Sequence, residues 1–195
     1  RARFTGLSGH GSESRAQHDN AIHKAANWTH KTLSWIQEQG FSYQMLEGLP
    51  FNVGKIQGGI KANMIAAECE LTFGFRPLPG QDGQALLTEL QDLAANKEDL
   101  QLTPGFTGPT LPAANRDLQA AMSESAALAN ELELDVGAPV SFWTEASLFS
   151  EAGFTAIVYG PGDIAQAHTA NEWVALSQLE QVANQYVTII QSDKK

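Results

Sequence analysis

The side chains of this chain that could do acid–base or metal chemistry include five histidines, and two of these stand in glycine-rich loops. His10 lies between two glycines within Gly6–Ser12, and His168 follows the turn Gly160–Gly162 after an apolar segment. Ligand sites of open α/β sheets form at the carboxyl ends of strands, which suits the position of His168. From the residues alone, a surface location explains His10 better, whereas a functional and a structural role for His168 are equally open.

The other histidines and the single cysteine favour structural interpretations. His23 and His30 are seven residues apart in a predicted helix, so they share a face and could form a metal pair. A solvated polar face is favoured because no third ligand is evident. Cys69 lies on the apolar face of an alternating strand, where a core residue is more frequent than a nucleophile. A single cysteine forms no internal disulfide, which fits a reducing, cytoplasmic setting.

Two further polar residues stand at the ends of a predicted strand. Asn63 lies at its start, where an amide side chain could satisfy backbone groups of a turn. Arg76 is its last residue. It could pair with Glu70 as an ordinary surface arginine, or it could clamp a carboxylate, since only arginine presents a bidentate fork.

The composition excludes several classes of protein. Of the 195 residues 43% are hydrophobic and 17% charged, so the chain can bury a core and is not a disordered tail. Its net charge of -10 argues against nucleic-acid binding, which needs a cationic surface. No apolar run approaches the ~20 residues of a membrane helix. Motifs of P-loops, nucleophile elbows, H-E-x-x-H zinc sites and dinucleotide folds are also absent from the sequence.

The first half of the chain predicts a small α+β unit. Its elements follow the order strand, helix, strand, strand, helix, strand. This order is typical of the ferredoxin-like βαββαβ arrangement, an antiparallel sheet with two helices on one face. The expected ranges are strands 1–7, 51–57, 64–76 and 100–102, and helices 18–38 and around 86–93.

Two of these elements indicate which face is buried. The strand 64–76 alternates apolar and polar residues, the period-2 pattern of a half-buried sheet. The helix 18–38 has apolar residues at helical spacing and ends at Gly40, a C-terminal cap. The expected buried residues are Cys69, Leu71, Phe73 and Phe75 on the strand and Ile22, Ala26, Leu33 and Ile36 on the helix.

A linker rich in proline and glycine, residues 103–112, precedes a different pattern. Beyond it we expect helix 115–133, a short strand 139–143, a second helix, the apolar strand 155–159 and a last helix ending near Ile190. Helices alternating with apolar strands indicate a parallel α/β sheet, yet two strands are too few for a free-standing one. Because the chain also opens on Arg1 in mid-strand, we expect a fragment, divided into residues 1–105 and 106–195.

Four groups of residues, taken in order, resemble one enzyme family. They are Gly6-x-x-Gly9-His10-Gly11-Ser12 with Asn20-Ala21-Ile22, Gly58-Gly59-x-x-Ala62-Asn63-Met64-Ile65, Phe75-Arg76-Pro77-Leu78-Pro79-Gly80, and Gly160-Pro161-Gly162 with Ala167-His168-Thr169-x-x-Glu172. Each is weak alone, but their order and spacing over nearly the whole chain resemble the dinuclear-zinc amidohydrolases, which include acetylornithine deacetylase, succinyl-diaminopimelate desuccinylase and carboxypeptidase G. The segment 143–147 is most similar to the acetylornithine and acetylcitrulline deacetylase branch.

The resemblance implies a fold, a cofactor and a partner. Members have a zinc-binding α/β catalytic domain interrupted by a smaller lid domain, through which they form homodimers. This chain would be the lid (about 1–105) and the C-terminal part of the catalytic domain (about 106–195). The implied reaction is zinc-dependent hydrolysis of the amide of N-acetylornithine or N-acetylcitrulline in arginine biosynthesis, with two metal ions per site and cobalt as a substitute. The other metal ligands and the general base are expected upstream of Arg1, so these residues alone are expected to be inactive and to bind no stoichiometric zinc.

The resemblance also implies roles for single residues. His168 matches the C-terminal zinc ligand, and His10 matches the lid histidine that enters the partner's site and stabilises the oxyanion. Asn63 matches a lid asparagine that contacts substrate across the dimer, and Arg76 an arginine associated with recognition of the substrate carboxylate. The residues matched to the substrate pocket are Thr144, Glu145 and Gly160.

Two departures from the family pattern and two alternatives accompany this interpretation. Glu145 stands where many relatives carry Asp, and Ser14-Arg15-Ala16 stands where a proline usually follows the lid histidine motif. From another class, the alternative is a non-catalytic ferredoxin-like module that dimerises or binds a ligand. Within the family, the alternative is an aminoacylase or a carboxypeptidase.

Overall fold

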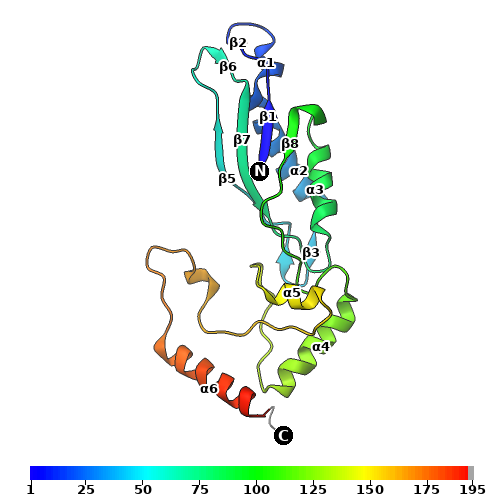
Figure 1. Ribbon diagram of the computed structural model, residues 1–195, viewed down its shortest axis with the longest axis vertical. Helices are drawn as coiled ribbons and strands as arrows, with labels where there is room; N and C mark the ends of the chain where they lie inside the picture. Colours follow the sequence, from blue (N-terminus) through cyan, green and yellow to red (C-terminus); the bar gives the residue numbers. More distant parts are fainter. Residues whose placement is uncertain (193–195) are drawn as a thin grey trace.

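The computed structural model describes residues 1–192, which form an elongated molecule with two parts along its long axis (Figure 1). The N-terminal unit, residues 1–102, occupies one end, and the C-terminal segment, residues 103–192, occupies the other. Within residues 1–192 we find no helix that is long and apolar enough to cross a bilayer.

A four-stranded antiparallel sheet with strand order β5-β7-β1-β8 forms the N-terminal unit. The helix α2 connects β1 to β5, and α3 connects β7 to β8, so each central strand has an edge strand beside it. The predicted ferredoxin-like βαββαβ arrangement is therefore confirmed. The bounds are β1 Ala2–Thr5, α2 Ala21–Gln39, β5 Phe51–Gly58, β7 Glu68–Phe75, α3 Gly83–Asp92 and β8 Leu100–Leu102, with a 3-10 helix at Lys97–Asp99.

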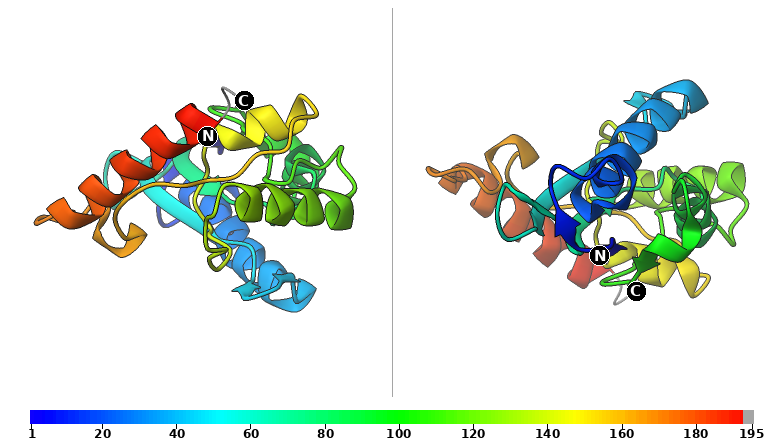
Figure 2. Two further views of the ribbon diagram at one scale, coloured as in Figure 1. Left: turned by 90° about the horizontal axis from the view of Figure 1, so that it is seen from below. Right: turned by 90° about the horizontal axis from the view of Figure 1, so that it is seen from above.

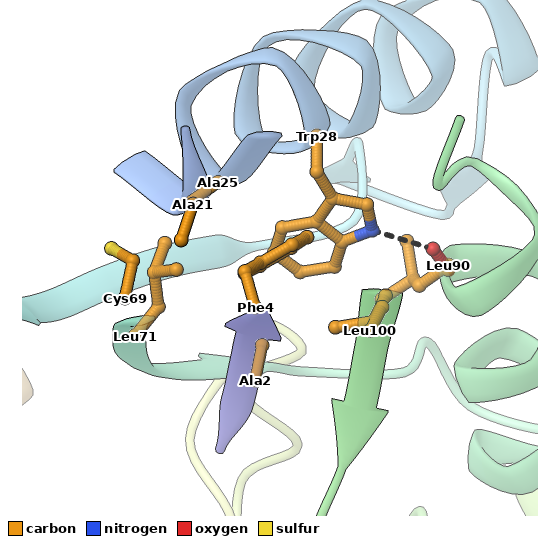
Figure 3. Packing of buried hydrophobic residues seen from close by; sticks show 9 residues of the cluster. All are labelled: Ala2, Phe4, Ala21, Ala25, Trp28, Cys69, Leu71, Leu90 and Leu100. Carbon is orange, nitrogen blue, oxygen red and sulfur yellow. Dashed lines mark hydrogen bonds between the residues drawn. The ribbon is translucent and has the colours of Figure 1, made fainter. Parts of the chain in front are cut away.

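Trp28 of α2 stands at the centre of the core of this unit (Figure 3). Its ring contacts Phe4 of β1 and Phe73 of β7, with centroids 5.8 and 5.3 Å away. The indole N–H donates a hydrogen bond of 2.8 Å to the carbonyl oxygen of Leu90 in α3. A buried indole needs such an acceptor, because an unpaired N–H in the core costs free energy. This one side chain therefore joins the sheet to both helices.

The predicted buried face is confirmed for the strand and partly wrong for the helix. Cys69 and Leu71 are buried and Phe73 and Phe75 are half-buried, while the alternating Glu68 and Glu70 are exposed. On α2, however, Ala26 and Leu33 face solvent. Burial of the large indole directs the neighbouring stripe of the helix at the sheet, and alanines in that stripe permit close approach. The buried residues of α2 are Ala21, Ala25, Trp28, Thr32 and Ile36.

Two predicted elements are each divided in the structure. The short helix α1 (Ala16–Asp19) precedes α2, because Asn20 has an extended backbone and its side chain caps α2 by accepting the N–H of Ile22. The predicted strand 64–76 contains two strands, β6 (Met64–Ile65) and β7. Residues 66 and 67 interrupt them, and β6 pairs instead with β2 (Gly9–His10).

A small hairpin links the two parts of the molecule. Its strands are β3 (Ser42–Tyr43) and β4 (Leu46–Glu47), neither of which the sequence pattern predicts. The hydroxyl of Tyr43 donates to the sulfur of Met122 in α4 (Leu118–Glu131) at 3.0 Å. The hairpin thus attaches the N-terminal unit to the first helix of the C-terminal segment.

The C-terminal segment contains the predicted helices but not the predicted strands. Residues 139–143 and 155–159 are not paired in a sheet among the described residues. A β-strand requires a neighbouring strand for its hydrogen bonds. Apolar side chains there, such as Val140 and Val158, remain exposed. The helices are α4 Leu118–Glu131, α5 Ala146–Glu151 and α6 Leu176–Ser192, with a 3-10 helix at Ile164–Gln166, and Figure 2 shows α6 on the opposite side of the molecule from α2.

Candidate functional site

His10 and Asn63 lie close together at the free end of the N-terminal unit. The pairing of β2 with β6 sets His10 opposite Met64, and the N–H of Gly11 donates to the carbonyl of Asn63 at 2.8 Å. Figure 1 places β2 and β6 at the end of the molecule farthest from the C-terminal segment. Both site residues are exposed. The structure therefore brings these two predicted site residues together on a surface open to a partner.

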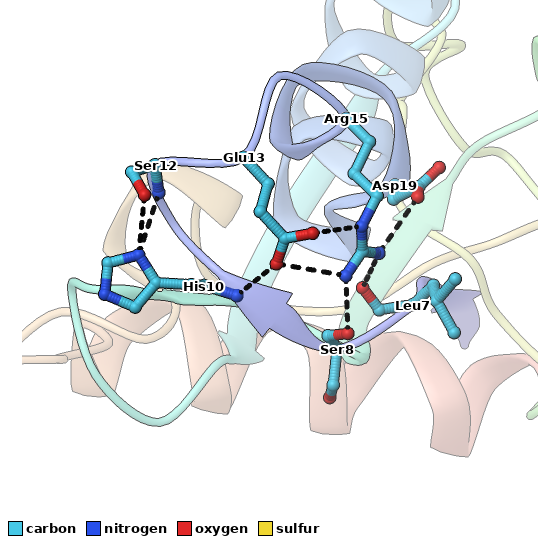
Figure 4. A network of polar contacts seen from close by, with 7 residues as sticks. All are labelled: Leu7, Ser8, His10, Ser12, Glu13, Arg15 and Asp19. Carbon is cyan, nitrogen blue, oxygen red and sulfur yellow. Dashed lines mark hydrogen bonds and ion pairs between the residues drawn. The ribbon is translucent and has the colours of Figure 1, made fainter.

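A polar network holds the loop that carries His10 (Figure 4). The carboxylate oxygen Oε1 of Glu13 accepts the backbone N–H of His10 at 2.7 Å. The guanidinium of Arg15 donates five hydrogen bonds of 2.9 to 3.3 Å within the same network. Its acceptors are the carboxylates of Glu13 and Asp19 and the carbonyl oxygens of Leu7 and Ser8.

The ionised groups of this network stabilise one another. Hydrogen bonding from Arg15, and then from the backbone of His10, lowers the pKa of the Glu13 carboxyl below its ordinary value of 4.5. In return, hydrogen bonds to Glu13 and Asp19 raise the pKa of Arg15. Both partners are therefore charged at neutral pH, and their hydrogen bonds are of the stronger, charge-assisted kind.

Arg76 lies at the other end of β7, beside an open cavity of about 1800 Å³ between the two parts of the molecule. Its backbone N–H donates to Pro50 at 2.9 Å, and its side chain is exposed. Glu70 pairs with Arg1 at 3.9 Å, not with Arg76. Among the described residues the guanidinium of Arg76 has no carboxylate partner, so its fork is free for a ligand.

Three predicted pocket residues belong to the C-terminal segment. Thr144 and Gly160 line the same cavity as Arg76. Thr144 is half-buried, and its carbonyl accepts the hydroxyl of Ser147 at 2.8 Å, which fixes the start of α5. Glu145 is the exposed N-cap residue of α5 and, within residues 1–192, is not among the residues that line the cavity.

His168 is exposed and has an unusual backbone. Its φ is 61°, in the left-handed region that residues other than glycine seldom adopt. Its N–H donates to the carboxylate of Glu172 at 3.1 Å. Non-glycine residues in this conformation cluster at functional sites, where the surrounding structure holds them. The ring of His168 is not part of the cavity lining among the described residues.

The described side chains do not complete a metal site. Within residues 1–192 no three His, Cys, Asp or Glu side chains converge. Zinc takes three or four protein ligands, so His168 fits one ligand position and not a whole site. His23 and His30 are exposed on α2, as a solvated face requires. Cys69 is buried, and burial raises the pKa of its thiol, which makes it a core residue and a poor nucleophile.

Five of the seven predicted site residues thus form two groups separated by the length of β7, whereas Glu145 and His168, within residues 1–192, do not line the cavity. At ~3.3 Å per residue, this eight-residue strand separates its ends by roughly 25 Å. His10 and Asn63 lie beyond one end, and Arg76 lies beyond the other. The motifs of the sequence do not include the network residues Glu13 and Arg15, although an arginine four residues before Asp19 is a recognisable helical ion-pair spacing.

Comparison with known proteins bears on both parts. Residues 1–99 match the M20 family of peptidase dimerisation domains. The chain is 44% identical over 192 residues to N-acetyl-L-citrulline deacetylase of Xanthomonas campestris, covering 96% of this chain and 52% of that protein. It is 31% identical over 185 residues to acetylornithine deacetylase of Yersinia pseudotuberculosis, covering 91% of this chain and 46% of that one. The chain therefore spans about half the length of these curated relatives.

Solved structures show the same fold at low sequence identity. Aminopeptidase PepT of Bacillus cereus superposes on all of this chain and 51% of its own, with a TM-score of 0.60 and 17% identity. A putative aminohydrolase from methicillin-resistant Staphylococcus aureus superposes on 97% of this chain and 49% of its own, with a TM-score of 0.64 and 17% identity. Because the dimerisation-domain match covers more than half of its residues, the chain belongs to the M20 peptidase family.

Proposed function

We propose that this chain is part of a dinuclear-zinc deacetylase that hydrolyses the amide of an N-acetyl amino acid and releases acetate. N-acetylcitrulline is the first candidate substrate and N-acetylornithine the second. The observation that carries the proposal is the 44% identity to an N-acetyl-L-citrulline deacetylase over nearly the whole chain. Under this proposal residues 1–105 are the lid and residues 106–195 a part of the catalytic domain.

Within such an enzyme the cavity side of the molecule would bind metal and substrate. A bound dinuclear zinc, or cobalt in its place, would supply a water of near-neutral pKa and would polarise the amide carbonyl. His168 would contribute one imidazole ligand. The free fork of Arg76 would bind the α-carboxylate of the substrate in bidentate geometry. Thr144 and Gly160 would line the pocket, with Glu145 at its edge.

The free end of the N-terminal unit would complete the site of a second copy. His10 would donate a hydrogen bond to the oxyanion that forms when the amide carbonyl is attacked, an interaction worth ~3–4 kcal/mol. Asn63 would contact the substrate from the same surface. The roughly 25 Å between the ends of β7 supports contribution across a dimer, because His10 and Arg76 of one chain do not reach one small substrate.

A homodimer through the N-terminal unit is supported by its match to a dimerisation domain. We place the contact at β5, an edge strand of eight residues whose residues from Lys55 to Gly58 are all exposed. An edge strand of this length has unpaired backbone groups along one side and can pair with a second strand. Antiparallel pairing of two β5 strands would extend the sheet across the dimer axis.

The test uses the gene product that contains these residues and measures acetate release from N-acetylcitrulline and N-acetylornithine. A His168→Ala variant should lose at least about 100-fold in kcat/KM, with dimerisation unchanged. The matched control is His30→Ala, an exposed histidine on α2, which should keep full activity. If the unmodified protein hydrolyses neither substrate, the remaining interpretation is a non-catalytic module that dimerises or binds a ligand. If it prefers another acyl amino acid or a peptide, it is an aminoacylase or a carboxypeptidase.

A further inference from the structure

The loop that carries His10 depends on one guanidinium group. Arg15 bonds to the backbone at Leu7 and Ser8, before the histidine, and to Asp19 in α1, after it. The guanidinium of Arg15 therefore joins the two ends of the loop through hydrogen bonds from one rigid group. Lysine has the same charge but one nitrogen, which cannot meet acceptors in so many directions.

Arg15 is connected to His10 through a shared oxygen. Oε1 of Glu13 accepts Nη2 of Arg15 at 3.3 Å and the backbone N–H of His10 at 2.7 Å. Because Arg15 also donates to Oε2, the carboxylate has a defined orientation when it meets His10. Gly9 leaves room for this arrangement, since a Cβ there would lie 2.0 Å from Nη2 of Arg15 and 2.5 Å from Oε1 of Glu13.

The loop also determines which nitrogen of His10 carries the proton in the neutral ring. The backbone N–H of Ser12 donates to Nδ1 at 3.3 Å, and the Ser12 hydroxyl lies 2.8 Å from the same atom. A backbone N–H is always a donor, so Nδ1 is an acceptor and the proton of the neutral ring is on Nε2. Figure 4 shows Nε2 directed away from the network.

We propose that Arg15 is a positioning residue for His10: acting through Glu13, it holds the loop so that the ring presents its Nε2–H outward as a hydrogen-bond donor. This inference rests on the proposed function, in which that donor meets the oxyanion in the partner's site. The hydrogen bonds that hold this arrangement all lie within residues 7–19, so it needs no group from a partner or a substrate, and an oxyanion donor must be held in this way to act without reorganisation.

The experiment replaces Arg15 with lysine, which keeps the charge and loses the fork. The matched control is Arg3→Lys, because Arg3 lies on the same unit and makes a single ion pair of 2.6 Å with Glu68. In the 195-residue chain, NMR measures two properties that do not depend on catalysis. They are the imidazole ¹⁵N shifts of His10 and the hydrogen exchange rate of its backbone amide. In the gene product, kcat and KM for N-acetylcitrulline are measured for the same variants.

In the unmodified chain the ¹⁵N shifts of the neutral ring should show an unprotonated Nδ1 and a protonated Nε2. In Arg15→Lys the two shifts should approach each other, and exchange of the His10 amide should rise at least about 5-fold. In the gene product kcat should fall about 10-fold while KM changes less than about 2-fold, because an oxyanion donor acts in the transition state. The control Arg3→Lys should change neither the two NMR measurements nor kcat and KM.

Unchanged shifts and exchange in a folded Arg15→Lys chain would overturn the proposal. If Arg15→Lys does not fold, Glu13→Gln tests the same link, since it keeps the shape and loses the charge, and unchanged exchange of the His10 amide would again overturn it. A gene product that hydrolyses no N-acetyl amino acid would contradict the proposed function alone, because the NMR results would still show whether Arg15 positions His10.

Discussion

His10 and Arg76 lie beyond opposite ends of β7, with the whole length of the strand between them. One lies at the free end of the N-terminal unit, and the other lines the cavity beside the C-terminal segment. If both serve one substrate, as the proposed function requires, they come from different copies of the chain. Under that proposal the dimer would be a part of the active site.

Mixing two inactive variants of the gene product should therefore restore activity. His10→Ala removes the donor given to the partner, and His168→Ala removes a metal ligand of the chain's own site. In a mixed dimer one of the two sites has both residues. Random exchange of subunits should recover about a quarter of full activity, measured as acetate release after mixing. No recovery after verified subunit exchange would mean that both residues act within one chain.

A charge added at the edge of β5 should weaken the dimer. Ile56 is 55% exposed on this edge strand, and an added lysine there opposes pairing with a second strand. We expect Ile56→Lys to raise the dimer dissociation constant at least about 10-fold, measured by analytical ultracentrifugation. Gln101→Lys on β8, the opposite edge, is the control. Dissociation by the control variant alone would move the interface to β8.

The hydrogen bond of Trp28 can be separated from its packing. Trp28→Phe keeps an aromatic ring but leaves the carbonyl of Leu90 without its donor, which should cost about 1–2 kcal/mol of unfolding free energy. Trp28→Ala should cost about 3–5 kcal/mol. Urea unfolding of the chain followed by circular dichroism measures both. Trp173→Phe, at a residue that is 61% exposed, should change the free energy by less than about 0.5 kcal/mol.

The network around His10 should weaken in acid. The pKa of Glu13 in the folded chain lies below its ordinary value of 4.5, chiefly because Arg15 donates to its carboxylate. The network is therefore complete above pH 4.5 and is lost as the pH falls through the lower folded value. Arg15, together with the backbone and the ring of His10, is what acts on this carboxylate. Titration of the Glu13 carboxyl carbon by ¹³C NMR should give a midpoint below pH 4.5, and Arg15→Lys should raise this midpoint. A midpoint of 4.5 or higher in the unmodified chain would contradict the ion pair.

The 195-residue chain by itself should bind no zinc tightly. Its described residues bring no three potential ligands together, and one imidazole does not hold the ion against solvent. Metal analysis after gel filtration should find less than about 0.1 zinc per chain. Two tightly held ions per chain would show that residues 1–195 contain a complete centre.

The sequence predicts the N-terminal unit better than the C-terminal segment, and the reason is physical. Alternation in β7 and helical periodicity in α2 report burial against partners that are themselves within residues 1–102. The segments 139–143 and 155–159 have strand-like composition, yet no strand pairs with them among the described residues. Composition reports a preference for the sheet, whereas a strand exists only with a hydrogen-bonded neighbour.

The sequence points to candidate site residues but not to their arrangement. Glycine-flanked His10 and strand-terminal Arg76 stand out by residue type and position. Their spacing in the sequence does not indicate that they lie beyond opposite ends of β7, because the pairing of β2 with β6 determines where His10 lies. Arg15 was missed as a positioning residue because its five acceptors include backbone carbonyls, which leave no mark on residue type.

The left-handed backbone of His168 reduces the free energy of unfolding, and interactions elsewhere in the chain must offset this loss. Glycine would adopt a φ of 61° freely, whereas a residue with a Cβ gives up roughly 1–2 kcal/mol there. At this position, the residue that favours stability of the fold is therefore not the residue that supplies an imidazole. Selection for heat resistance alone would favour glycine here, and the chain would lose the imidazole of His168.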